Sequence, residues 1–219
     1  FGLDPDEVEV VHGDTREVQY GLGTYGSRSL SVGGSALTKA ADKIIEKGRE
    51  IAAYKLDTDA ENIDYLDAIY TARDSNKTIS FKEVAFAAYV PHDYPLDKLE
   101  PGLEAVTFYD PENFTYPAGS YVCEVEVDPD TGTTEIMQFV AVDDFGKIVN
   151  PMIVEGQVHG GLAQGIGQAL LEHGVYEASA GQLVTGSFMD YALPRADNLV
   201  NFKLDLTETP CTHNPLGVK

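Results

Sequence analysis

The first half of the chain begins with a short acidic and apolar segment, followed by a glycine-rich loop and an amphipathic stretch. Acidic and valine residues alternate over residues 7–11 and lead into Gly-Asp-Thr, which predicts a strand entering a turn. The glycine-rich loop covers residues 21–29. After it, apolar residues recur at helical spacing and predict one face of a helix ending near Tyr54; they are Leu37, Ala40, Ala41, Ile44 and Ile45. The loop therefore leads into a helix N-terminus.

The middle of the chain, residues 57–117, is more polar and predicts only short elements. Ser80, with Glu83 three residues later, has the pattern of a capping box, so a helix is expected to start there. Prolines then interrupt regular structure at positions 91, 95, 101, 111 and 117. Residues 91–117 are therefore expected to form a connecting, partly extended stretch.

Apolar and polar residues alternate again in the second half of the chain, as they do in a half-buried strand. Tyr121, Cys123, Val125 and Val127 face one way with glutamates between them, and a turn at 128–132 precedes a second apolar run at 136–142. This pattern predicts a β-hairpin whose second strand is the more buried one.

A second long helix is expected to begin at Pro151, because a proline in the first helical turn loses no hydrogen bond. Its pattern continues to about His173. Apolar and polar residues alternate again over residues 200–206 and predict another strand.

Composition sets limits on the class of protein. With 219 residues, of which 43% are hydrophobic, the chain can bury a core, and no run approaches the roughly 20 apolar residues that cross a bilayer. A net charge of −21 disfavours binding to nucleic acid or to anionic membranes. An anionic ligand would therefore need local backbone N–H groups and a few cations.

The residues that commonly bind metals show no ligand pattern. Two cysteines are too few for a disulfide scaffold or a four-thiolate site, and they fit a reducing, cytoplasmic environment. The five histidines lack metal-ligand spacing, so each is expected to be structural or exposed. No metal-binding residue is predicted.

The glycine-rich loop contains Gly21, Gly23 and Gly26 at the spacing of a dinucleotide-binding fingerprint. That motif requires a strand running into the loop and a later acidic residue at a strand end. Here the expected strand ends too early, and Asp42 and Glu46 fall inside a helix. Two interpretations stay open: a phosphate or pyrophosphate cradle formed with the Ser-Arg-Ser sequence at 27–29, or a tight turn with a surface arginine.

The second long helix is rich in glycine, at positions 156, 160, 161, 165 and 167. Each interior glycine costs roughly 0.5–1 kcal/mol relative to alanine, so something must compensate. Close helix packing is one explanation and a bulky ligand against the backbone is the other. Gln157, Gln164 and Gln168 lie among these glycines as neutral amides, either in contact with a ligand or on the helix surface.

Paired acids follow the predicted second hairpin strand, in the sequence Asp-Asp-Phe-Gly at 143–146. Such a pair is compatible with catalysis, metal binding or turn formation. Turn formation is favoured, since neither a histidine nor a second carboxylate pair lies nearby in the sequence.

Five ordered blocks resemble the molybdenum hydroxylase large subunits, the family of xanthine dehydrogenase and aldehyde oxidase, and especially the bacterial carbon monoxide dehydrogenase-like branch. They span nearly the whole chain, which makes the resemblance more specific than any single motif. The blocks are VVHGDT at 10–15, GLGTYGSRS at 21–29, AVDDFGKIVNPMIVEGQVHGGLAQGIGQALLE at 141–172, GSFMDYALPRA at 186–196 and ETPCTHNPLGVK at 208–219.

The resemblance implies an α+β fold, with twisted sheets and helices packed on one face, in two parts covering 1–117 and 118–219. It implies a molybdopterin cofactor with molybdenum, expected as the cytosine dinucleotide. Residues that match the family's cofactor contacts are Gly26, Ser27, Arg28 and Ser29 in the loop, Gln164 in the second helix, and Asp144 and Phe145 after the hairpin.

The resemblance also implies an oxidoreductase that oxidises an aldehyde, an N-heterocycle or carbon monoxide with water as the oxygen source. Electrons would pass through 2Fe–2S clusters to FAD on partner subunits, in a cytoplasmic dimer of heterotrimers. The other possibility is a non-catalytic assembly or scaffold domain that kept the fold.

Two features depart from the family pattern. The family's substrate-side loop and a glycine- and glutamine-rich cofactor loop are absent, and the family's catalytic glutamate is expected beyond Lys219. The chain thus resembles an excised domain, a split subunit or a piece cut at a domain boundary. No catalytic residue is assigned within it, and by itself it is expected to be inactive.

Overall fold

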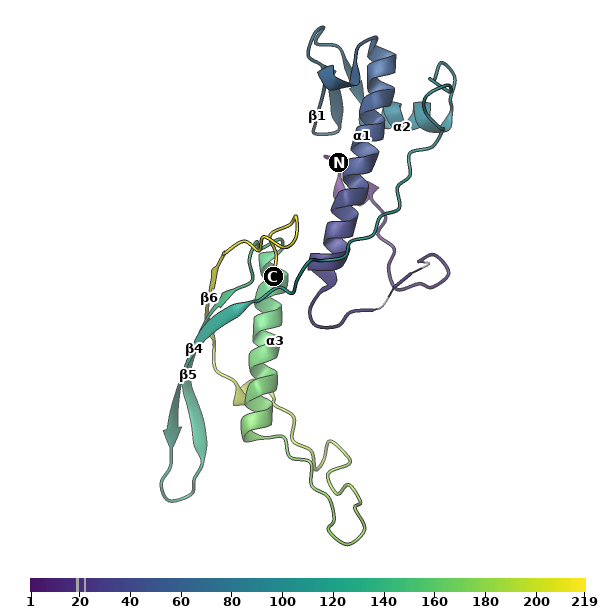
Figure 1. The fold of residues 1–219 in the computed structure, drawn as a ribbon. Coiled ribbons are helices and arrows are strands. Elements are labelled where there is room, and N and C mark those ends of the chain that lie inside the picture. Colours follow the sequence, from purple (N-terminus) through teal and green to yellow (C-terminus); the bar gives the residue numbers. More distant parts are fainter. Residues whose placement is uncertain (19, 22) are drawn as a thin grey trace. The chain divides into compact units, whose positions relative to one another are not determined.

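The computed structural model describes residues 1–18, 20–21 and 23–219. The chain divides into two compact units, Phe1–Glu112 and Asn113–Lys219 (Figure 1). The sequence placed a boundary after residue 117, a few residues further along. None of the described helices is both long enough and apolar enough to cross a membrane.

The first unit combines two helices with a small antiparallel sheet. Its elements are the 3-10 turn η1 (Pro5–Glu7), the π turn η2 (Ser29–Gly34), α1 (Ser35–Leu56), η3 (Ala60–Asn62), β1 (Ile63–Leu66), β2 (Ile69–Ala72), β3 (Thr78–Ser80) and α2 (Phe81–Tyr89). The three strands pair in the order β1-β2-β3. The predicted capping box of α2 is confirmed: Glu83 N–H donates to Ser80 Oγ (3.2 Å) and Ser80 N–H to Glu83 Oε2 (2.9 Å).

The prediction of a strand at residues 7–11 is wrong. Asp4 accepts a hydrogen bond from Asp6 N–H and caps the short turn η1, and the residues that follow form no strand. Val10 is 77% exposed and Val8 and Val11 remain 48% and 44% exposed, so the alternation produces no buried face. A period of two identifies a strand only where another strand and a core are available to it.

The core of the first unit lies against the C-terminal half of α1. Ile51 and Ala52 are fully buried, whereas Leu37, at the start of the predicted apolar face, is 72% exposed. Fully buried Tyr70, from β2, crosses α1 at Gly48 and donates from its hydroxyl to Ile45 O (3.3 Å). Burial raises the pKa of the Tyr70 phenol.

The second unit contains the hairpin and the second long helix, as predicted. Its elements are β4 (Ala118–Val127), β5 (Thr134–Asp144), α3 (Pro151–Leu170), η4 (Ala196–Asn198) and β6 (Lys203–Thr207). β4 and β5 pair antiparallel, and β6 joins β5 in parallel. β5 is more buried than β4, which confirms that part of the hairpin prediction.

Helix α3 runs along one face of the second sheet (Figure 1). The rings of His159 in α3 and Phe202 lie 5.5 Å apart, and Phe202 is 5.8 Å from Phe139 of β5. Val158 and Ile166 are the apolar side chains that α3 buries. Both units mix helices with small sheets, and the α+β class is confirmed.

Replacing Gly48 by alanine tests the packing of α1 on the sheet. The added Cβ would overlap the Tyr70 hydroxyl and lie 2.8 Å from its Cζ atom. We expect a loss of about 1–3 kcal/mol in the free energy of unfolding, measured by urea denaturation. Combining Gly48→Ala with Tyr70→Phe should recover part of the lost stability, because Tyr70→Phe removes the hydroxyl oxygen that the new Cβ would overlap. An unchanged stability of Gly48→Ala would contradict this packing.

Candidate functional site

The backbone of the glycine-rich loop changes from the left-handed to the right-handed conformation just before the first long helix. Gly26 and Ser27 have φ angles of 58° and 54°, and Arg28 returns to the right-handed region with φ −98°. Such a reversal turns successive N–H groups toward one side, an arrangement that binds anions. The Thr24 and Ser29 hydroxyls lie 2.8 Å apart and close the loop.

Buried serine hydroxyls tie this loop to the helix that follows. Ser31 Oγ donates to Arg28 O (3.2 Å) and Ser35 Oγ donates to Ser31 O (2.7 Å). Arg28 is half-buried, with its guanidinium carbon 5.7 Å from the centre of the Tyr25 ring. Within the described residues, neither η2 nor α1 has a side-chain cap. Because η2 runs directly into α1, and Ser35 N–H donates to Val32 O, the helix start that lies beside the positive charge of Arg28 is the first turn of η2.

The glycines of α3 differ in their surroundings. A Cβ added to Gly167 would meet Glu172 Oε1 at 2.6 Å and Pro194 Cδ at 2.9 Å, so packing explains this glycine. A Cβ on any of the other four, at positions 156, 160, 161 and 165, would have no neighbour within 4 Å. Packing within the described structure therefore accounts for only one of the five.

Gln164 lies on the open side of α3. At 3.6 residues per turn, Gln157, Gly160 and Gln164 share one side of the helix, and all three are exposed. Gly161 and Gly165 line a groove beside the β4–β5 hairpin. Because Gly161 lies four residues after Gln157, it borders the first side, so the open glycines form two adjoining surfaces and Gln164 belongs to the first.

Asp143 and Asp144 are the last two residues of β5, and the turn that was favoured from the sequence begins at Asp144. Asp144 Oδ1 accepts hydrogen bonds from Gly146 N–H (2.9 Å) and Thr209 N–H (3.1 Å), and Lys219 Nζ lies 3.2 Å away. These contacts lower the pKa of the Asp144 carboxyl well below its usual range, and the contacts with Thr209 have the largest effect. The Asp144 side chain is 16% exposed. Oδ1 therefore already serves three partners within the chain.

The last residues of the chain close over this turn; we call residues 208–219 the clasp. Lys219 N–H donates to the carbonyl of half-buried Phe145 (2.8 Å), and Lys147 N–H donates to Gly217 O (2.8 Å). Gly146 has φ 68°, and a Cβ there would overlap Gly217 O, so glycine is required. Glu208 Oε1 accepts from Ile148 N–H at 3.0 Å.

Two buried polar side chains have partners that the sequence did not reveal: Asp143, which was weighed only as one of a pair of acids, and Asn214, which was not singled out. Asp143 is 4% exposed and accepts a hydrogen bond from the Tyr121 hydroxyl. Asn214, 8% exposed, donates from its amide to Val218 O (2.8 Å) and accepts from Val218 N–H (3.2 Å). Partners 22 residues away in the chain leave no local signal for Asp143, whereas the Asn-Pro-Leu-Gly sequence around Asn214 does indicate a turn.

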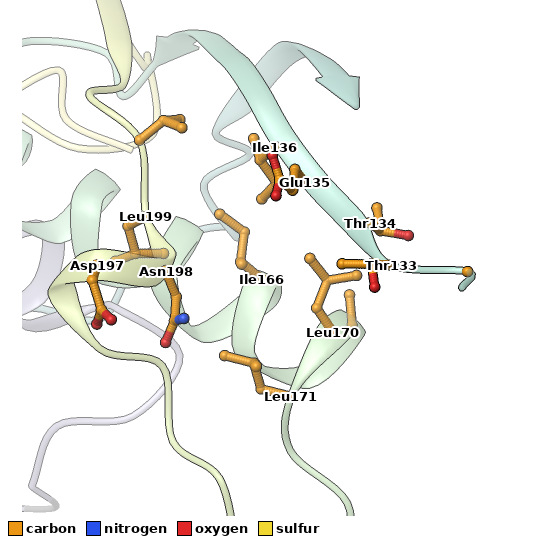
Figure 2. A pocket seen from close by; sticks show the side chains of 13 residues that line it. Thr133, Thr134, Glu135, Ile136, Ile166, Leu170, Leu171, Asp197, Asn198 and Leu199 are labelled. Carbon is orange, nitrogen blue, oxygen red and sulfur yellow. The ribbon is translucent and has the colours of Figure 1, made fainter. Parts of the chain in front are cut away.

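An open pocket of about 760 Å³ lies at the C-terminal end of α3 (Figure 2). Ile136, Ile166 and Leu170 supply apolar walls, and Glu135 and Asp197 add negative charge. None of the predicted site residues lines it, and it contains no lysine or arginine. This pocket therefore does not suit an anionic ligand.

The predicted residues fall in both units. Gly26, Ser27, Arg28 and Ser29 lie in the first unit, while Asp144, Phe145 and Gln164 lie in the second. Within the second unit, Asp144 and Phe145 form one turn and Gln164 lies on α3. Across the part of the chain that the structure describes, no three His, Cys, Asp or Glu residues gather as a metal site.

Comparison with known proteins identifies the family. Residues 1–200 match the family model described as molybdopterin cofactor-binding domain. The chain belongs to this family. The same molybdopterin cofactor-binding domain is 44% identical over 220 residues to the carbon monoxide dehydrogenase large chain of Hydrogenophaga pseudoflava, covering 100% of this chain and 27% of the relative.

Other relatives act on different molecules. Identity is 37% to the 6-hydroxypseudooxynicotine dehydrogenase complex subunit gamma of Paenarthrobacter nicotinovorans, over 98% of this chain and 27% of that one. The chain spans about a quarter of the length of these relatives.

Solved structures share the fold of this cofactor-binding domain. Cu,Mo-CO dehydrogenase in its carbon monoxide reduced state superposes with a TM-score of 0.90 at 41% identity, covering 98% of this chain and 26% of that one. Quinoline 2-oxidoreductase from Pseudomonas putida 86 superposes with a TM-score of 0.83 at 37% identity, covering 91% of this chain and 25% of that one.

Asp144→Asn tests the role of the clasp through its pH dependence. Because the folded-state pKa of Asp144 lies below that of the unfolded chain, its ionised form stabilises the fold above about pH 4. That contribution should disappear as the pH falls toward the folded-state pKa. We therefore expect Asp144→Asn to lower the melting temperature at pH 7, and the difference from wild type to narrow below pH 4.

The control is Asp197→Asn, which removes the same charge from a side chain that is 75% exposed. It should change the melting temperature little at any pH. Equal effects of the two substitutions would show that Asp144 acts only through net charge.

Proposed function

We propose that this chain forms part of the binding site for a molybdopterin dinucleotide, in the cytosine form, within the large chain of a molybdenum-dependent oxidoreductase. The observation that carries the proposal is the backbone reversal at Gly26 and Ser27 beside Arg28. It offers converging N–H groups and a guanidinium on a chain whose net charge is −21. The pyrophosphate of a dinucleotide needs such local donors to overcome the surrounding negative charge.

The loop residues have separate tasks in this proposal. Arg28 supplies the positive charge, and its guanidinium geometry suits two phosphate oxygens at once. The hydroxyls of Ser27 and Ser29 add donors at the same turn. Gly26 keeps the backbone free of a side chain on the ligand side.

The first glycine surface of α3, with Gly156, Gly160 and Gln164, fits a flat heterocycle lying against the helix. A Cβ at either glycine would point into open space, so a ring can approach the backbone closely. The exposed amide of Gln164 can donate to and accept from ring nitrogens and oxygens. Asp144 acts differently: it holds the turn that contains Phe145, and so positions that segment instead of binding the cofactor directly.

When bound, the molybdenum cofactor supplies the redox chemistry, in which a carbon centre is hydroxylated with water-derived oxygen and two electrons are removed. This chain contributes binding, orientation and exclusion of water on its side of the cofactor. No general base is proposed among the residues that the structure describes. The isolated chain should therefore be inactive.

The complete enzyme is proposed to include an iron–sulfur subunit with 2Fe–2S clusters and an FAD subunit, as a dimer of heterotrimers in the cytoplasm. Relatives are named for carbon monoxide, a nicotine derivative and quinoline. The substrate of this enzyme is thus a small molecule of the carbon monoxide, aldehyde or N-heterocycle class.

Arg28→Ala should lower the nucleotide and molybdenum content of the full-length enzyme about tenfold or more, because a charge-assisted contact to phosphate is lost. The measurement is metal analysis with nucleotide release on the purified complex. Arg16→Ala is the matched control, since Arg16 pairs with the neighbouring Asp14 and its side chain is 86% exposed. Retention of full cofactor by Arg28→Ala would make Arg28 a surface residue and refute the cradle.

Gly160→Ala separates stability from cofactor binding. In the 219-residue chain it should raise the free energy of unfolding by about 0.5–1 kcal/mol, because alanine favours a helix and its Cβ meets nothing. In the full-length enzyme the same methyl should reduce cofactor content. Gly167→Ala is the contrasting control and should destabilise the chain by about 1–3 kcal/mol through contact with Pro194. Normal cofactor content in Gly160→Ala would exclude this surface from the site.

A further inference from the structure

Strand β4 is a long exposed edge. Within the described residues it pairs with β5 alone, and all ten of its residues are exposed. The N–H and C=O groups on its outer side can therefore pair with another strand. Edges of this length usually either carry protection or receive a partner.

An apolar groove runs along one face of β4. Cys123 and Val125 of β4 line it together with Ile136 and Phe139 of β5 and with Leu162 and Ile166 of α3. Its volume is about 320 Å³. A strand added to β4 would extend the sheet over this groove, and every second side chain would point toward α3.

The second glycine surface of α3 enlarges the groove. Gly161 and Gly165 line it, and a Cβ at either position would have no neighbour within 4 Å. The space left by these two missing side chains suits large apolar residues on the incoming strand. Gly161 borders the side of α3 that carries Gln157 and Gln164, whereas Gly165 lies about 100° farther round from Gln164.

The opposite face of β4 is acidic. Glu124 and Glu126 point there, and Glu126 lies directly across from Glu135 of β5. Like charges in opposite positions of a hairpin are unfavourable. Lysine or arginine side chains on an adjacent strand would relieve this repulsion. The residues that alternate with the apolar ones on the incoming strand should therefore be basic.

Charge also decides between possible sources of that strand. A second copy paired through its own β4 would bring Glu124 and Glu126 of both copies together, on chains that each carry a net charge of −21. The relatives, by contrast, hold roughly three quarters of their length outside the matched region. A segment of the same polypeptide reaches the edge at a high effective concentration.

We propose that β4 is the docking edge for an extended segment of the large polypeptide, in which large apolar residues over the groove alternate with basic residues beside Glu124 and Glu126. The proposal uses the length of the relatives but not the cofactor assignment. Failure of cofactor binding would leave it intact.

Hydrogen exchange tests the pairing in the full-length large chain that carries this sequence. The β4 amides that do not bond to β5 should exchange about tenfold or more slowly there than in the 219-residue chain. Val125→Lys puts a charge into the groove and should restore fast exchange at these amides. Val149→Lys, at a valine that is 59% exposed and outside the groove, should not. Equal exchange of β4 in both lengths of chain would overturn the proposal.

Photocrosslinking identifies the source of the strand. With p-benzoylphenylalanine in place of Val122, whose side chain is 68% exposed on the acidic face, the crosslinked peptide should come from the same polypeptide outside the 219 residues. It should contain basic residues at alternate positions. Crosslinks to another subunit or to a second copy would overturn the assignment. Circular dichroism of each variant confirms that the fold is retained.

Discussion

The Asp144 carboxylate joins two parts of the second unit that lie far apart in the sequence. One oxygen receives the Gly146 and Thr209 N–H groups and the Lys219 ammonium, so the end of β5 and the clasp are fixed together. The helix α3 starts a few residues later, where Asn150 caps it by accepting from Ile153 N–H. The direction in which α3 leaves the sheet, and hence the placement of its two glycine surfaces, depends on this turn.

The glycines of α3, each of which lowers helix stability, have two kinds of surroundings. Gly167 allows Pro194 to approach, whereas the four others face open space on two flanks. Helix propensity alone would favour alanine at those four. Their retention is expected if close neighbours are present in the full enzyme: the cofactor on the flank of Gly160 and a strand on the flank of Gly165.

Elements defined by local signals were predicted well from the sequence. The hairpin, the helix from Pro151 and the capping box at Ser80 each carry their signal within a few residues. The strand at 7–11 failed because alternation without a partner does not make a sheet. The bonds of Asp143 and Asp144 join residues up to 75 positions apart, and such pairings have no trace in local pattern. The family resemblance named Asp144, but only the structure shows what its carboxylate holds.

The Tyr70 contact clamps the C-terminal half of α1 in the core, whereas the start of the helix is held by Thr107, whose hydroxyl donates to Ala36 O (2.6 Å). Apart from Ser35, the buried residues of α1 begin at Gly48, roughly 20 Å from the helix start at about 1.5 Å per residue. A tilt of about 3° at that clamp would displace the loop at Gly26–Ser29 by about 1 Å. Displacements of that size can alter rates about a hundredfold in enzymes. Substitutions in this distant core are therefore a means of shifting the proposed cofactor loop without altering its own residues.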